Sequence, residues 1–253
     1  MPIEFRKSAA SDRHRESSLI QSSVVASANM LFTSLRGKLI VSCQADPGDP
    51  MDHVDTVARM ATSVLRGGAG GLRAEGRECV RAFRAITDLP IIGMVKAKDR
   101  NGEVYITPTF DGAVAVSEAG ADIIALDCTH RRLSEAEPWP DLIRKVHTEL
   151  NRPVLADIAS LEDGIAAQEA GADAVATTLY GYTAETAGIR SFSWPLLQAL
   201  IRQLQIPVIA EGHINEPGDV RRALDMGAYS ALVGSAITRP QTITARFVAA
   251  TRT

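Results

Sequence analysis

Residues 152–178 read RPVLADIASLEDGIAAQEAGADAVATT, and this stretch decides the fold of the chain. It holds two short hydrophobic runs, Val154–Asp157 and Ala174–Thr178, separated by a longer segment. Proline introduces the first run, and it suits the first residue of a strand because it has no N–H to give to a sheet. Gly171 introduces the second run, where a glycine ends a preceding helix in the left-handed conformation. The stretch therefore predicts a strand, a helix and a second strand.

The same unit recurs along the whole chain of 253 residues. The predicted strands are the hydrophobic runs Leu39–Cys43, Gly71–Ala74, Ile91–Lys96, Ile123–Asp127, Val154–Asp157, Ala174–Thr178, Val208–Glu211 and Ser230–Gly234. Nearly continuous hydrophobic runs are typical of strands buried on both faces of a parallel sheet. The segments between them carry helical periodicity, and proline and glycine starts alternate. Four such βαβα units predict an α/β fold, a single (β/α)8 TIM barrel. The rival, an open doubly wound sheet, calls for a glycine-rich turn after the first strand, which residues 43–46 do not form.

The chain divides at about residue 36 into two parts. Residues 1–36 are rich in Ser, Ala and Arg, and we expect an N-terminal extension that is partly disordered or helical. It has no continuous apolar region of the kind a secretory signal needs, although a transit peptide stays an alternative. Residues 37–253 are the predicted barrel, which we expect to be the catalytic domain.

The composition narrows the classes of function. The net charge is −3, and Lys and Arg form no stripe, which argues against a nucleic-acid partner. No apolar run approaches the roughly 20 residues of a membrane span. Three widely spaced cysteines, Cys43, Cys79 and Cys128, indicate neither a disulfide framework nor a zinc motif. We expect reduced thiols and a cytoplasmic protein.

Polar residues follow the hydrophobic runs, and in a barrel of this kind the active site lies at the carboxyl ends of the strands. The strand-end residues are Gln44, Arg73, Lys96, Asp127, Asp157, Thr177, Thr178, Glu211, Gly234 and Ser235. Solvation at a strand end explains one or two such residues. A ring that converges on one axis favours a catalytic site instead.

Lys96 and Glu211 are the candidate catalytic residues. A lysine at the mouth of an apolar barrel loses hydration, so its pKa should fall. It can then serve as a general base or as a Schiff-base nucleophile, whereas the simpler alternative is a salt-bridged lysine at the rim. Glu211 could hold a sugar hydroxyl or share proton transfer with Lys96.

The last two strands predict a phosphate site. Glycines at Gly212 and Gly234, with Ser235, let backbone N–H groups approach an anion, although glycines also serve simple turns. Arg239 could clamp the phosphate or a substrate oxygen with two hydrogen bonds.

The histidines carry less information. His130 and His213 are expected on loops at the catalytic end, and His14, His53 and His147 away from it. No set of His, Asp and Glu has the spacing of metal ligands, so we expect no metal site.

These motifs together resemble the N-acylmannosamine-6-phosphate 2-epimerase family. The matching stretches are residues 39–44, 71–74, 90–96, 105–109, 125–129, 156–158, 177–183, 209–212 and 233–240. The resemblance implies interconversion of N-acetylmannosamine 6-phosphate and N-acetylglucosamine 6-phosphate in sialic acid breakdown, without a cofactor. It implies catalytic roles for Lys96 and Glu211, and sugar-binding roles for Gln44, Arg73, Asp157 and Arg239. Tyr180 and His213 depart from the residues usual in the family and could retune the pocket.

The expected reaction is a proton exchange at C2 of the open-chain sugar, with neutral Lys96 as the base. Arg73 or Gln44 could stabilise the oxyanion. Either Glu211 or a substrate hydroxyl would return the proton, and the residues leave this open. Asp127 and Thr178 are expected to bind substrate. A Schiff-base aldolase and a non-catalytic sugar-phosphate-binding barrel remain as alternatives. The expected partner is a small phosphosugar, with neither a membrane nor nucleic acid, and a homodimer is an open option.

Overall fold

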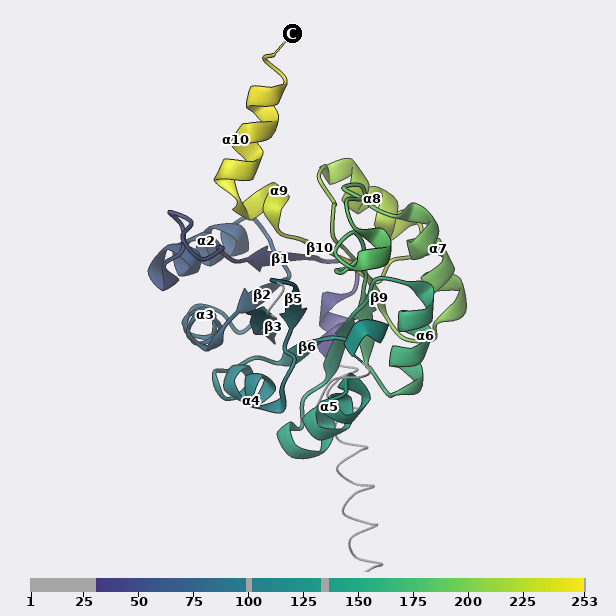
Figure 1. Cartoon of the computed structure of the whole chain (residues 1–253). Coiled ribbons are helices and arrows are strands. Elements are labelled where there is room, and N and C mark those ends of the chain that lie inside the picture. The colour runs from purple at the N-terminus through teal and green to yellow at the C-terminus, as the bar shows by residue number, and fades with distance from the viewer. Residues whose placement is uncertain (1–30, 99–101, 133–136, 253) are drawn as a thin grey trace, which may run out of the picture.

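A closed parallel barrel forms the body of the protein in the computed structural model, which describes residues 31–98, 102–132 and 137–252 (Figure 1). Neighbouring strands follow the order β1-β10-β9-β8-β7-β6-β3-β2. The barrel strands are β1 (Leu39–Cys43), β2 (Gly71–Glu75), β3 (Ile91–Met94), β6 (Ile123–Asp127), β7 (Val154–Asp157), β8 (Ala174–Ala176), β9 (Val208–Glu211) and β10 (Ser230–Val233). The prediction of a single (β/α)8 barrel is therefore confirmed.

Most of the helices surround the barrel and connect successive strands, and the last two follow the final strand. They are α2 (Val54–Arg66), α3 (Arg77–Arg84), α4 (Phe110–Glu118), α5 (Trp139–Lys145), α6 (Leu161–Glu169), α7 (Trp194–Gln203), α8 (Pro217–Asp225), α9 (Ser235–Thr238) and α10 (Pro240–Ala249). A π-helical turn, Val146–Leu150, continues α5, and short 3₁₀ turns cover His130–Arg132 and Ala184–Thr186. None of the helices in the described part of the chain is both long enough and apolar enough to cross a membrane.

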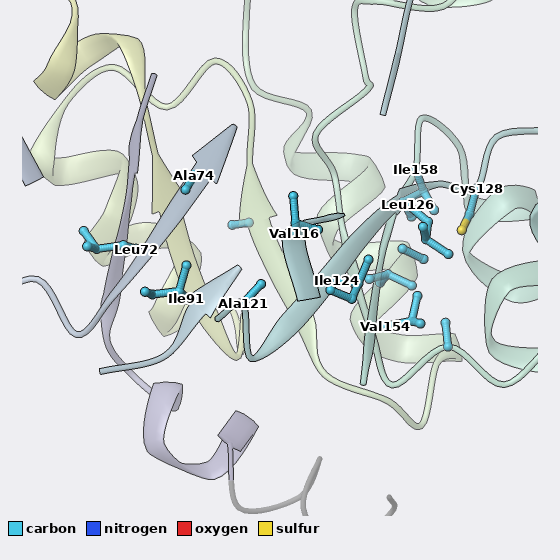
Figure 2. Close-up of a cluster of buried hydrophobic side chains, with 14 of the residues drawn as sticks. Leu72, Ala74, Ile91, Val116, Ala121, Ile124, Leu126, Cys128, Val154 and Ile158 are labelled. Carbon is cyan, nitrogen blue, oxygen red and sulfur yellow. The ribbon is translucent and has the colours of Figure 1, made fainter. Parts of the chain in front are cut away.

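Two hydrophobic layers hold the barrel, because successive side chains of a strand point to opposite faces. The outer layer lies between strands and helices and includes Leu72, Ile124 and Val116 of α4 (Figure 2). Gly93 of β3 lets α4 approach, since a Cβ there would meet the Cβ atoms of Ala121 at 2.6 Å and Val116 at 3.0 Å.

The inner layer fills the barrel toward its amino-terminal end. Ile40, Ile92 and Leu155 belong to this layer and are fully buried. Residues 31–35 are helical, and Phe32 and Leu35 pack into the same cluster from the amino-terminal end of the barrel. Residues 1–30, most of the expected extension, lie outside the described residues.

The predicted end of the third strand is wrong. The strand was expected over Ile91–Lys96, but β3 ends at Met94. Lys96 instead begins β4 (Lys96–Lys98), which pairs antiparallel with β5 (Val104–Ile106) in a separate two-stranded sheet. The hydrophobic run crosses this junction without interruption, so periodicity could not reveal that the chain leaves the barrel wall.

The C-terminal helix stands apart from the barrel. Figure 1 shows α10 extending outward beyond α9 to the C-terminus. No residue of α10 is buried, and the side chain of Phe247 is 73% exposed.

Candidate active site

An arginine and two carboxylates form the centre of the carboxyl end of the barrel. Arg73 of β2 donates from Nη1 to Asp157 Oδ1 at 2.9 Å and from Nη2 to Asp157 Oδ2 at 2.6 Å. Its Nη1 also donates to Glu211 Oε2 at 2.8 Å. Alternation along β2, β7 and β9 points these three side chains into the barrel, and all three residues are buried.

The charge balance of this cluster disfavours two ionised carboxylates. One guanidinium faces two acids in a buried site, and burial raises the pKa of Glu211 to about 7, against the opposing attraction of Arg73. Thr178 Oγ lies 2.5 Å from Asp157 Oδ1 and 2.9 Å from Glu211 Oε2. A hydroxyl has one proton to donate, so both contacts are satisfied at once when Glu211 is protonated and donates to Thr178.

Lys96 lies beside this cluster at the same end of the barrel. Its side chain is 32% exposed, and burial lowers its pKa from the ordinary value of a lysine. Its Nζ is 3.7 Å from Asp46 Oδ1, while Arg73 and Glu75 also act on its charge. The site thus combines an amine that loses its proton more easily than usual with a carboxyl that keeps one longer.

Arg239 and Gln44 line the side of the mouth next to Lys96. Arg239 makes two hydrogen bonds to Asp46, from Nη1 at 2.7 Å and from Nη2 at 3.0 Å. Gln44 Nε2 donates to Ser42 Oγ at 2.5 Å. Asp46 therefore joins Arg239 and Lys96 in one surface network, although sequence reasoning did not select it.

The predicted phosphate residues lie after β9 and β10. Gly212 has φ of +86°, a conformation that residues with a side chain rarely adopt. Gly234 directly precedes α9, whose first residue is the exposed Ser235. Thr238 in α9 donates to the carbonyl of Ser42 at 2.8 Å, which ties this turn to β1.

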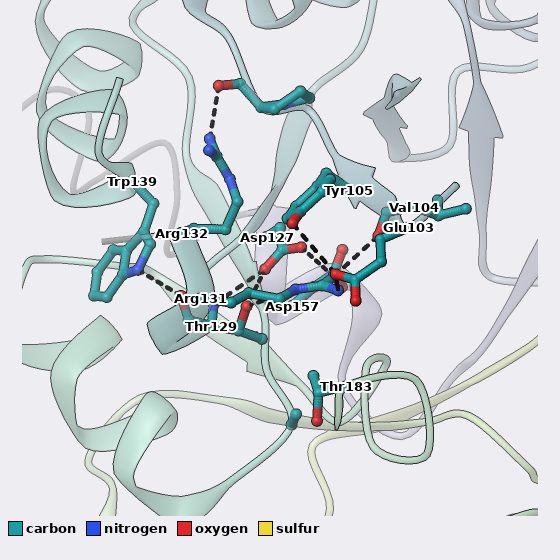
Figure 3. A network of polar contacts seen from close by, with 12 residues as sticks. Glu103, Val104, Tyr105, Asp127, Thr129, Arg131, Arg132, Trp139, Asp157 and Thr183 are labelled. Carbon is teal, nitrogen blue, oxygen red and sulfur yellow. Dashed lines mark hydrogen bonds and ion pairs between the residues drawn. The ribbon is translucent and has the colours of Figure 1, made fainter. Parts of the chain in front are cut away.

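Asp127 belongs to a second network, separate from the hydrogen bonds of Arg73. It is in register with Asp157 on the neighbouring strand. Its carboxylate accepts from Arg131 Nη2 at 2.7 Å and from Thr129, through the backbone N–H at 3.1 Å and the hydroxyl at 2.6 Å (Figure 3). The structure therefore joins Arg73, Asp157, Glu211 and Thr178 directly, but not Asp127.

Sequence reasoning missed several neighbours of these residues. Glu75 ends β2 and faces Lys96, and the predicted strand stopped one residue short of it. Arg131 is the partner of Asp127 and lies in a turn without a periodic signal. The placement of His53 was wrong: it precedes α2 in the β1–α2 connection, which lies at the carboxyl end. The position of His53 after the first predicted strand and before the next helix was the signal that could have placed it at the carboxyl end.

Cavities occur at both ends of the barrel in the described part of the chain. One, of about 260 Å³, lies at the carboxyl ends of β1 and β2 and is lined by Gln44, His53, Glu75 and Cys79, among others. The larger, of about 490 Å³, lies at the opposite, amino-terminal end beside Phe32 and Tyr229. Among the described residues that line the larger cavity, Asp173 is the only acidic one, and it is 2.8 Å from His147. The candidate catalytic side chains are therefore gathered at the carboxyl end of the barrel. No group of three or more His, Cys, Asp or Glu suited to a metal ion occurs within residues 31–98, 102–132 and 137–252.

The fold and the buried cluster define a (β/α)8-barrel enzyme with its site at the carboxyl ends of the strands. The sequence profile of the family described as "NanE: Putative N-acetylmannosamine-6-phosphate epimerase" matches residues 57–253. The chain belongs to this family.

Relatives and solved structures agree with this assignment. A "Putative N-acetylmannosamine-6-phosphate 2-epimerase" of Clostridium perfringens (strain SM101 / Type A) is 43% identical over 213 residues, 84% of this chain and 96% of the relative. A protein of the same name from Thermosynechococcus vestitus is 46% identical over 220 residues, 87% and 96% of the two chains. The solved N-acetylmannosamine-6-phosphate 2-epimerase from Clostridium perfringens is 42% identical, with a TM-score of 0.83, and the match covers 87% of this chain and 95% of that one. Thiamine phosphate pyrophosphorylase from Pyrococcus furiosus, 22% identical with a TM-score of 0.56, shares the fold.

Proposed function

We propose that this chain is an isomerase that interconverts N-acetylmannosamine 6-phosphate and N-acetylglucosamine 6-phosphate in sialic acid and amino sugar catabolism. Family membership supports the reaction. The observation that carries the chemistry is the buried Arg73, Asp157 and Glu211 cluster beside a half-buried Lys96. Such a site pairs a base with an acid at one end of the barrel.

Lys96 removes the proton from C2 of the open-chain sugar. The neighbouring C1 carbonyl acidifies that proton, and the electron pair moves onto the carbonyl oxygen to give an enolate. Burial lowers the pKa of Lys96, so a larger fraction of the amine is neutral and able to accept a proton.

Glu211 returns a proton to the opposite face of C2. Its raised pKa, about 7, keeps the carboxyl protonated in a substantial fraction of molecules at neutral pH. Thr178 supports this state because its hydroxyl can donate to Asp157 while accepting from Glu211. This role favours Glu211 over a substrate hydroxyl as the second proton carrier.

Arg73 orients the acids rather than receiving the oxyanion. Its Nη1 donates to both carboxylates, and its Nη2 donates to Asp157. Gln44 is half-buried at the rim, and its amide has a second N–H beyond the one given to Ser42. Gln44 is therefore the better donor to the developing oxyanion, because preorganised donors stabilise such charge most.

The phosphate binds at Gly212, Gly234 and Ser235, with Arg239 beside them. The positive φ of Gly212 and the position of Gly234 before α9 support backbone contacts to an anion. Arg239 is 15% exposed and held by Asp46, so phosphate would compete with that carboxylate. Binding energy from the phosphate helps to orient C2 against Lys96.

Proton NMR of N-acetylmannosamine 6-phosphate with the enzyme in heavy water tests the reaction. We expect N-acetylglucosamine 6-phosphate to form and deuterium to enter C2, and Lys96→Ala to abolish both. Lys98→Ala is the matched control, since Lys98 is an exposed lysine on the same hairpin. Tight binding without turnover by the unaltered protein would refute catalysis, and an adduct trapped on Lys96 by borohydride would instead indicate a Schiff-base aldolase.

The same proposal includes a homodimer in the cytoplasm. The unburied helix α10, with Phe247 at 73% exposure, supports association with a second copy. The free thiols of Cys43, Cys79 and Cys128 support a reducing compartment. Light scattering should give twice the mass of one chain, and Phe247→Glu should lower it. A single-chain mass at all concentrations would contradict the dimer, and recovery of the protein outside the cytoplasmic fraction would contradict the location.

A further inference from the structure

The amine of Lys96 is carried by a hairpin and not by the barrel wall. Lys96 is the first residue of β4 and pairs with Ile106 of β5. The base of this hairpin is closed by Thr107, whose N–H donates to the carbonyl of Val95 at 2.6 Å and whose hydroxyl accepts from the N–H of Val95 at 3.1 Å. The position of the amine therefore depends on how β4 and β5 sit against the barrel.

Arg131 ties the second strand of the hairpin to the barrel, and Arg132 also lies over the Tyr105 ring, 5.7 Å from its centre. Arg131 follows β6 and donates from Nη2 to the carbonyl of Val104 at 2.9 Å. Its guanidinium carbon lies 4.4 Å from the centre of the Tyr105 ring, and its Nη1 is 3.5 Å from Glu103 Oε2 (Figure 3). Arg131 thus contacts three successive residues, two of them in β5.

Asp127 fixes that arginine from the barrel side. The pair is at 2.7 Å, with side-chain exposures of 14% for Arg131 and 0% for Asp127. The other carboxylate oxygen of Asp127 accepts both bonds from Thr129, and Thr129 Oγ also accepts from Arg131 Nε at 3.2 Å. The planar guanidinium can make these contacts simultaneously, which the single point charge of a lysine cannot.

We propose that Asp127 and Arg131 are positioning residues that hold the β4–β5 hairpin against β6 and thereby set the place of the Lys96 amine over the barrel. This inference rests on the proposed function for its effect on turnover. It gives Asp127 a role that acts through Lys96, in place of a direct contact with the sugar.

The pKa of Lys96 can test this proposal, because a residue that only stabilised the fold would leave that pKa unchanged. Among the residues that the structure describes, the charged groups that act on it are Asp46 before α2, Arg73 and Glu75 on β2, and Arg239 before α10. None of them lies on the hairpin or on β6, so they remain when Arg131 is changed. Loosening the hairpin would admit water to Lys96, and its lowered pKa would rise toward the ordinary value.

The test titrates Lys96 directly in the whole protein. The lysines are dimethylated with ¹³C-formaldehyde and followed by NMR across pH, with the Lys96 signal assigned by its loss in Lys96→Arg. Arg131→Gln and Asp127→Asn should raise the Lys96 midpoint by about half a pH unit or more, leave exposed Lys98 unchanged and lower kcat by roughly 10- to 100-fold. Arg131→Lys should be intermediate. Arg144→Gln, which removes an exposed arginine paired with Asp141, is the matched control.

The outcomes separate this inference from the proposed function. An unchanged Lys96 midpoint in folded Arg131→Gln overturns the positioning role, even if turnover falls. Full epimerase activity in Lys96→Ala overturns the base in the proposed function, while a shifted midpoint would still support the positioning pair. If either buried variant fails to fold, Tyr105→Leu keeps Asp127 and Arg131 but removes the stacked ring, together with its contacts to Glu103 and Arg132, and should raise the midpoint in the same direction.

Discussion

Arg73 and Asp157 form a two-pronged ion pair although they are 84 residues apart in the chain. Both side chains are at most 1% exposed, and the two bonds are 2.9 and 2.6 Å long. The pair bridges strands that are not neighbours in the sheet, because β6 and β3 lie between β7 and β2. It ties two sides of the barrel together beneath the candidate catalytic groups.

We expect Arg73→Met to lose both stability and activity. The change leaves Asp157 and Glu211 buried without their counter-charge, and breaking a buried pair in this way typically costs about 3–5 kcal/mol. Chemical denaturation measures the loss, and the coupled epimerase assay should show a decrease in kcat/KM of at least about 100-fold.

The matched control for this change is Arg81→Met on α3. Arg81 is 53% exposed and pairs with Glu78 three residues away. An exposed pair contributes at most about 1 kcal/mol, so this variant should stay close to the unaltered protein. Equal stabilities of the Arg73 and Arg81 variants would contradict the role assigned to the buried pair.

Glu211→Gln should change how stability depends on pH. The pKa of Glu211 rises from 4.5 to about 7 on folding, so the folded state binds the extra proton and stability falls as pH rises from about 5 to 8. The shift corresponds to about 3 kcal/mol. Glutamine cannot ionise, so the variant should lack this part of the decline.

Urea unfolding at pH 5 and pH 8 measures the difference for both proteins. Groups that titrate elsewhere contribute equally to the two and cancel in the comparison. A decline of the same size in the variant and the unaltered protein would show that Glu211 does not hold a proton near neutral pH.

Two glycine-to-alanine changes should have opposite effects. Gly93→Ala places a methyl group 2.6 Å from Ala121 Cβ, so it should destabilise the protein by about 1–3 kcal/mol. Gly218→Ala in α8 meets nothing within 4 Å and should stabilise it by up to about 1 kcal/mol, because alanine restricts the unfolded chain. Thermal unfolding compares the two directly, and a stabilising Gly93→Ala would mean that α4 packs less tightly than described.

Much of the architecture was accessible from local patterns. Proline and glycine at the strand starts mark where each strand begins, and hydrophobic runs mark buried parallel strands, so the number of barrel strands could be predicted. The end of the third strand could not. Ile91 to Val95 are all apolar or glycine, so nothing local signals that β3 ends at Met94 and that Lys96 begins a hairpin.

The sequence by itself determined the barrel and the set of polar residues at the carboxyl ends of its strands, because strand spacing and side-chain alternation are local properties. Only the tertiary structure decided which of those residues meet. Arg73 joins Asp157 and Glu211, whereas Asp127 joins Arg131 and the hairpin. The physical reason is that closure of the barrel sets the distances between distant strand ends, and these distances decide which charges share a buried site.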